Sequence, residues 1–126
     1  MNDGDLTASK SRDWVNQPIG LFVWWVLPVI VAMAASSARL PLRMVAFVWA
    51  GAFVWMGTGC LLNALRCRRL HCYVSGPVLW VGAAAMASIG FGSLSGRALA
   101  VVLWTTAGLV TASFVPEIIW DRYRAR

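Results

Sequence analysis

Four long runs of apolar residues without any charged side chain dominate this sequence. They cover residues 18–37, 44–64, 77–92 and 98–115, and none of them contains Asp, Glu, Lys or Arg. A helix of about 20 apolar residues is long enough to cross the hydrocarbon core of a bilayer. A helix also satisfies its own backbone hydrogen bonds where no water is present. The runs therefore predict an all-α membrane protein with four transmembrane helices.

The composition argues against an ordinary soluble domain. Hydrophobic residues make up 60% of the 126 residues and charged residues only 13%, whereas a soluble domain carries about 25% charged residues. A small domain cannot bury that much apolar surface in its own core. The surplus is expected to face lipid, and four crossings with short turns account for residues 18–120.

The basic residues predict the orientation. Lys and Arg number two before residue 18, three in the central segment and three after residue 120, against three in the other two turns together. Basic residues gather on the cytoplasmic side, so both ends and the central loop are predicted to be cytoplasmic, with the protein in the cell inner membrane. Residues 1–17 are predicted to be a mobile tail and residues 121–126 a short basic tail. Contact with lipid headgroups explains the net charge of +6, and no nucleic-acid partner is expected.

Two prolines influence the predicted helices. Pro28 lies inside the first run and is expected to kink it. Ser75-Gly76-Pro77 reads as a turn that closes a polar loop and starts the third crossing. That crossing is rich in Gly, Ala and Ser, which places it inside the bundle. As an alternative for the first run, Ala32-Met33-Ala34 resembles the processing site of a cleaved signal peptide.

A cluster of metal-binding residue types lies where the second crossing meets the central loop. It consists of Cys60, Cys67, His71 and Cys72. At about 100° per residue, Cys60 and Cys67 project onto one helical stripe, which His71 extends. Thiolates with an imidazole suit thiophilic ions such as Hg(II), Cu(I) or Zn(II). The leading hypothesis is therefore a membrane protein that binds or passes such an ion at its cytoplasmic face, with Cys60 as an inner relay.

Other interpretations of the same residues remain open. Free cysteines also act as small hydrophobic residues, and the arginines beside them are ordinary orientation anchors. Cys67 and Cys72 would form a redox sensor if they paired reversibly. In a further alternative the chain is a non-catalytic accessory or scaffold subunit, whose third helix docks a larger membrane complex or a second copy. The sequence has no nucleotide-binding loop or metalloprotease motif, so no enzyme is expected, and no charge lies deep in an apolar run, which argues against ion-coupled transport.

The stretch from Asn63 to Pro77, NALRCRRLHCYVSGP, resembles small bacterial and archaeal membrane proteins with a Cys…His-Cys-Tyr-x-Ser/Thr-Gly-Pro motif in a cytoplasmic loop. That resemblance marks Cys67, His71 and Cys72, together with Tyr73, Gly76 and Pro77, but implies no particular activity. In size the chain is also similar to bacterial mercury-uptake membrane proteins, although it lacks their adjacent pair of cysteines. It is similar in length and helix number to small multidrug exporters, but it lacks the glutamate of their first helix.

Overall fold

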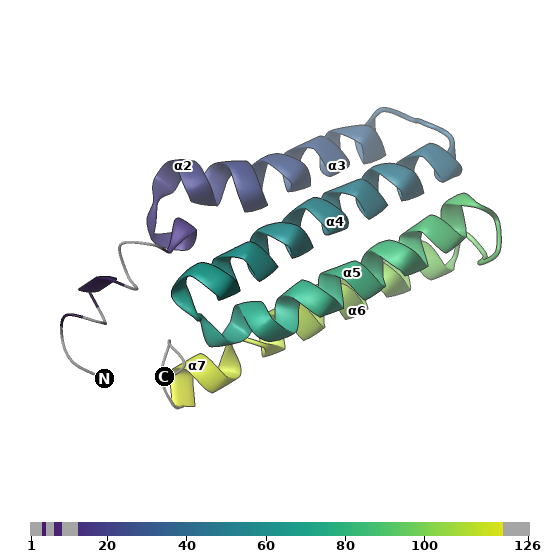
Figure 1. Cartoon of the computed structure of the whole chain (residues 1–126). Helices are drawn as coiled ribbons and strands as arrows, with labels where there is room; N and C mark the ends of the chain where they lie inside the picture. The colour runs from purple at the N-terminus through teal and green to yellow at the C-terminus, as the bar shows by residue number, and fades with distance from the viewer. Residues whose placement is uncertain (1–3, 5–6, 9–12, 120–126) are drawn as a thin grey trace.

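The computed structural model describes residues 4, 7, 8 and 13–119. In that part of the chain the helices form four long antiparallel segments that lie side by side (Figure 1). In chain order the elements are η1 (Trp14–Asn16), α2 (Pro18–Leu21), η2 (Phe22–Val26), α3 (Leu27–Ser37), α4 (Leu42–Cys67), α5 (Leu70–Gly90), α6 (Ala98–Ala112) and α7 (Val115–Ile119). The all-α prediction is confirmed.

Three of these segments are long and apolar enough to cross a membrane. They are Pro18–Ser37, Leu42–Arg66 and Leu70–Gly90, with mean hydropathies of 2.2, 1.8 and 1.5. The fourth, α6, is also apolar but has only 15 residues. At 1.5 Å per residue it is about 22 Å long, shorter than a hydrocarbon core of about 30 Å. These lengths are those of a multi-pass membrane protein with three full-length spans and one shorter apolar helix.

Pro28 changes the hydrogen bonding of the first segment without ending it. Because proline has no N–H, the carbonyl of Trp24 loses its normal helical partner. The turn just before the proline, η2, is π-helical, and the Leu27 N–H donates to the Phe22 carbonyl five residues back. The sequence predicted a kink at this position, and the structure has a π-helical turn directly before the proline, which is one of the usual causes of a kink.

The junction of α4 and α5 differs from its prediction. Only Arg68 and Arg69 separate the two helices, the first with a left-handed φ of 56° and the second with extended backbone. The expected polar loop up to Pro77 is therefore wrong. The third crossing begins at Leu70 instead of Pro77 and ends at Gly90, and the second runs from Leu42 to Cys67 instead of over 44–64.

Close contacts through glycine explain why Gly76-Pro77 is not a turn. A Cβ added to Gly76 would lie 2.8 Å from Cγ of Leu61 in α4, and one added to Gly57 would lie 2.6 Å from the Trp80 ring in α5. Glycine at these positions lets α4 and α5 approach closely, as is common between membrane helices. Because α5 packs against both α4 and α6, the prediction that the third crossing lies inside the bundle is confirmed.

The segment before the first membrane helix is folded against the bundle. Asp13 is completely buried, and the 3-10 helix η1 follows it directly. The Trp14 ring stacks on Trp24 with their centroids 5.1 Å apart. The prediction of a mobile tail is therefore wrong for residues 13–17. The acidic and small polar residues before them favoured that prediction. The predicted basic tail over 121–126 and most of the segment before Asp13 lie outside the described residues.

Candidate functional site

The site centres on two cysteines and a histidine at the end of the bundle where α4 turns into α5. We call Cys60, His71 and Cys72 the thiol cluster. Cys60 comes from α4, while His71 and Cys72 come from the first turn of α5. All three are at most 2% exposed, and neither Cys60 nor Cys72 forms a disulfide. The two-residue turn between α4 and α5 thus places the end of one helix beside the start of the next.

Cys72 is the best-connected member of the thiol cluster. Its Sγ lies 3.3 Å from Nε2 of His71. The side-chain amide of Asn63 donates to the same sulfur at 3.7 Å. The side chain of Cys72 lies next to that of Cys60 across the α4–α5 interface.

Cys60 is held from two other sides. The indole Nε1–H of Trp25 donates to its Sγ at 3.4 Å, and the hydroxyl of Ser75 lies 3.6 Å away. Ser75 also donates to the carbonyl of His71 at 2.9 Å, a common way for a serine to satisfy its hydroxyl inside a membrane helix. Polar side chains of the first helical segment and of α5 therefore contact this sulfur from two sides.

His71 is held by an aromatic contact. Its ring stacks on Phe114 with a centroid distance of 4.1 Å and an interplanar angle of 22°. Phe114 follows the end of α6, so this contact joins the end of the fourth helix to the start of α5. The imidazole therefore contacts an aromatic ring, and its Nε2 lies beside the sulfur of Cys72.

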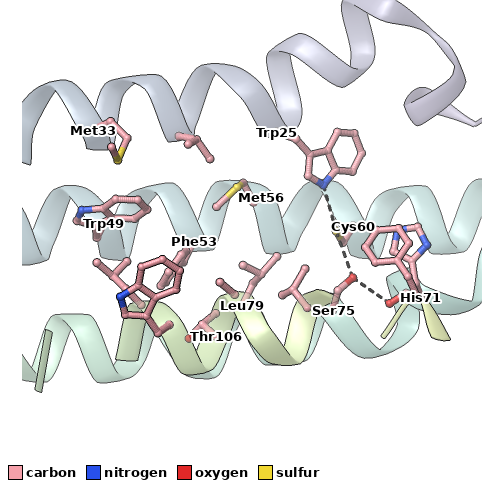
Figure 2. Close-up of a pocket in the computed structure, with 16 residues that line it drawn as sticks. Trp25, Met33, Trp49, Phe53, Met56, Cys60, His71, Ser75, Leu79 and Thr106 are labelled. Carbon is pink, nitrogen blue, oxygen red and sulfur yellow. Dashed lines mark hydrogen bonds between the residues drawn. The ribbon is translucent and has the colours of Figure 1, made fainter. Parts of the chain in front are cut away.

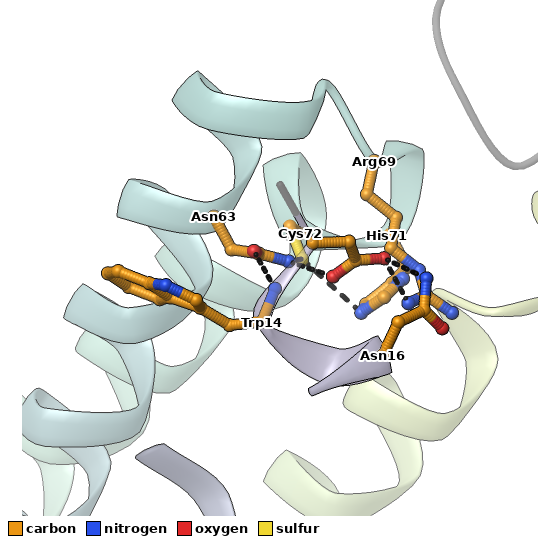
Figure 3. Close-up of polar contacts among 7 residues, drawn as sticks. Trp14, Asn16, Asn63, Arg69, His71 and Cys72 are labelled. Atoms are coloured by element: carbon orange, nitrogen blue, oxygen red, sulfur yellow. Dashed lines mark hydrogen bonds and ion pairs between the residues drawn. The ribbon is translucent and has the colours of Figure 1, made fainter. Parts of the chain in front are cut away.

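A buried polar network closes the same end of the bundle, and we call Asp13, Asn63 and Arg69 the ion-pair network. Oδ2 of Asp13 forms an ion pair with Nη1 of Arg69 at 2.7 Å. Asn63 donates to Oδ1 of Asp13 at 2.9 Å and accepts the backbone N–H of Trp14 at 3.0 Å. Figure 3 shows Asn63 between Trp14 and Cys72. Because Asn63 also donates to Cys72, the network is continuous with the thiol cluster.

The arginines of this region have partners other than the thiols. Arg69 pairs with Asp13, and the guanidinium of Arg66 lies 4.5 Å from the centroid of the Trp14 ring. Stacking of this kind is a favourable cation–π contact. Both arginines therefore fasten the N-terminal segment to the end of α4 and α5.

A cavity of about 490 Å³ runs from the thiol cluster along the bundle (Figure 2). We call it the groove. Cys60, His71 and Ser75 line one end, and apolar side chains of α3, α4, α5 and α6 line most of the rest, including Val29, Met33, Phe53, Met56, Leu79 and Leu103. The volume is in the range of sites for small molecules, about 300–1,000 Å³. The groove thus offers an apolar chamber with thiol, imidazole and hydroxyl groups at one end.

The structure brings together three of the four cysteine and histidine positions predicted from the sequence. Cys67 is the last residue of α4, and its side chain lies outside the described part of the molecule. Among the residues that are described, no group of three or more His, Cys, Asp or Glu side chains is arranged to hold a metal ion. The described donors therefore form a pair of thiols with an adjacent imidazole.

Sequence reasoning missed the groups that hold the cluster in place. Trp25 was one of eight tryptophans, and Asp13 was placed in the tail. The sequence signal for Asn63 and Ser75 is that each is a polar residue in or near an apolar run. A polar side chain in such a run usually has a partner within the protein.

No family model, curated protein or solved structure matches this chain. The resemblance of the segment from Asn63 to Pro77 to small bacterial and archaeal membrane proteins therefore stays a prediction.

Proposed function

We propose that this chain is a multi-pass inner-membrane protein that binds and passes a thiophilic metal ion through the thiol cluster. The observation that carries the proposal is the convergence of two buried thiols, Cys60 and Cys72, with the imidazole of His71 at 3.3 Å from the second sulfur. Cys67, at the end of α4, is the fourth donor of the proposal. The ion is the cargo of the protein.

The donor set favours ions that accept two sulfur ligands. A thiol must lose its proton to bind a metal, and a neutral imidazole beside Cys72 is a suitable acceptor. Thiolates select soft ions, and both Hg(II) and Cu(I) form stable complexes with two of them. Zn(II) usually requires four ligands, more than the described residues gather. Hg(II) and Cu(I) are therefore the preferred ions.

The proposal includes four crossings with both ends in the cytoplasm. The stacking of His71 on Phe114 supports this arrangement, because it brings the end of α6 to the start of α5. The ion pair between Asp13 and Arg69 brings the N-terminal segment to the same end of the bundle. The excess of basic residues in these segments assigns that end to the cytoplasm, and the thiol cluster then lies near the cytoplasmic surface.

Titration of the purified full-length protein with Hg(II) tests the proposal, with the ultraviolet charge-transfer band of mercury thiolate as the readout. We expect one ion per chain, and we expect Cys60→Ser or Cys72→Ser to abolish that band. A variant with both Cys72→Ser and Ser88→Cys keeps the number of thiols but moves one away from the cluster, and it should not restore binding. Unchanged binding in Cys60→Ser and Cys72→Ser would refute the proposal.

The accessory-subunit alternative has less support in the packing. Its docking element was the Gly- and Ala-rich third helix, and much of that surface is buried in α5, including Gly76, Gly82 and Ala83. A partner would instead meet the exposed side of α6, where Trp104 is 79% exposed. Crosslinking in native membranes separates the alternatives, because an accessory subunit yields one consistent partner and no bound metal.

A further inference from the structure

We infer that the groove admits a small, uncharged, lipophilic compound of a soft metal, an organomercurial of the type R–Hg–Cl, which reaches Cys60 from the bilayer. This inference rests on the proposed metal-binding function and names the chemical class of its substrate. It differs from the binding of a hydrated ion, which would approach the thiols from water.

The opening of the groove is the first observation. In the described bundle, α3 packs against α4 and α6 packs against α5, while α3 and α6 do not form an extensive contact with each other. The groove lies between these two outer helices, and Met33 and Trp104 on its two sides are 55% and 79% exposed. Because these positions lie within the apolar helices, the groove opens toward the hydrocarbon of the membrane.

The distribution of polar groups is the second observation. The reactive side chains lining the groove, Cys60 and His71, are at one end, and most of its length is apolar. A charged ion entering from lipid would lose its hydration along that length without replacement. A neutral compound with an organic group on the metal loses little hydration free energy in the groove, since its organic group contacts the apolar walls. The groove is therefore matched to a ligand with an apolar body and one soft metal centre.

The third observation is the closure of the opposite approach. Asp13 is completely buried and Arg69 is 9% exposed, and together with Asn63 they cover the thiol cluster at the α4–α5 turn. Trp14 adds a stacked ring beside them. Cys60 therefore faces a covered end on one side and the groove on the other.

The reaction at the cluster is a ligand exchange. The sulfur of Cys60 forms a bond to mercury while the mercury–chlorine bond breaks, and chloride leaves with the bonding electrons. The proton of the Cys60 thiol passes to Cys72, which gives its own proton to Nε2 of His71 in the tautomer that carries no hydrogen there. The products are Cys60-S–Hg–R, chloride and a protonated imidazole, and no oxidant or reductant is needed.

The rate of Cys60 modification in the full-length protein in liposomes tests the inference. The probes are phenylmercuric chloride and its charged sulfonate analogue, which share the same reactive centre. Trypsin cleavage after Arg66 and Arg68 separates the peptide of Cys60 from those of Cys67 and Cys72, so mass spectrometry assigns each adduct. We expect the uncharged probe to modify Cys60 much faster than the charged one.

Variants that narrow the groove from either side provide the control. Ala107→Phe on α6 and Val29→Phe on α3 each place a ring in the groove. Each is expected to slow the modification of Cys60 by the uncharged probe roughly tenfold. Ala100→Phe adds the same ring to α6 at an exposed position outside the groove and should leave the rate unchanged. Equal rates for both probes, or unaffected rates in both groove variants, would overturn the inference.

Failure of the underlying function gives a different result. If the wild-type protein did not bind Hg(II), the proposed function would fail even where the uncharged probe selectively modified Cys60. If Hg(II) bound normally but the groove variants reacted like the wild type, only the bilayer route would fail.

Discussion

At the scale of single residues, the most informative group is a carboxylate that the sequence places among mobile polar residues. Asp13 is fully buried, and its ion-pair partner Arg69 lies 56 positions further along the chain. A buried ion pair is seldom retained for stability alone, because desolvation of the charges offsets much of their attraction. Here it holds Asn63, and through Asn63 it holds the sulfur of Cys72. The pair therefore positions the thiol cluster.

Removing one member of this pair should destabilise the protein more than removing both. Asp13→Ala leaves Arg69 without its ion-pair partner, and we expect a loss of about 3–5 kcal/mol in the free energy of unfolding. Adding Arg69→Met should recover most of that loss, because an apolar side chain has no charge to desolvate. Thermal unfolding in detergent measures both effects. A double variant no more stable than Asp13→Ala would contradict this account.

The thiol cluster shows how far residue types alone can predict a site. Cys60, His71 and Cys72 were identified from their chemistry, and the structure brings them together. The prediction that His71 extends the helical stripe of Cys60 and Cys67 is wrong, because α4 ends at Cys67 and His71 lies in α5. Their partners Trp25 and Ser75 were not identified. Nothing in the local sequence distinguishes Trp25 from the other seven tryptophans. The packing of the first segment on α4 decides which tryptophan contacts Cys60.

At the scale of helices, the sequence predicted the number and approximate position of the long segments but not all of their ends. Charge-free apolar runs identified the first two correctly to within a few residues, since lipid allows few other structures. The start of α5 was misplaced by seven residues, from Leu70 to Pro77. Gly and Pro in soluble proteins mark turns, whereas here Gly76 provides space for Leu61.

Two glycines of α4 should respond oppositely to the same substitution. Gly57→Ala places a Cβ 2.6 Å from the Trp80 ring and 3.1 Å from the Gly76 carbonyl oxygen, and we expect it to cost about 1–3 kcal/mol by overpacking. Gly51→Ala meets nothing within 4 Å and should stabilise the helix by up to about 1 kcal/mol. Thermal unfolding of the two variants side by side provides the measurement. Equal shifts would show that close α4–α5 contact does not limit stability.

At the scale of the whole molecule, the bundle is held mainly through its two central helices. The contact between α4 and α5 is the most extensive, while α3 and α6 each cover one side of this pair. The groove follows from this arrangement, because the outer helices do not close against each other. No pattern in the sequence indicates the groove, because it depends on the relative placement of four helices.

The proposed topology predicts the location of both ends. Green fluorescent protein fused to either end should fluoresce in intact cells, and alkaline phosphatase fused to either end should be inactive. Phosphatase inserted after Leu94, in the turn between α5 and α6, should be active because that turn lies on the other side of the membrane. An active phosphatase at the C-terminal end would mean that α6, with its 15 residues, does not cross.

The wide turn of η2 also sets a register for everything that precedes it. The hydrogen bond from the Leu27 N–H to the Phe22 carbonyl spans five residues instead of the four of an α-helix, and this extra residue rotates the preceding segment by about 100° around the helix axis. Asp13 and Trp14 meet the α4–α5 corner in that rotated setting. Deletion of one residue from this turn would rotate Asp13 about the helix axis, away from Arg69 and toward lipid.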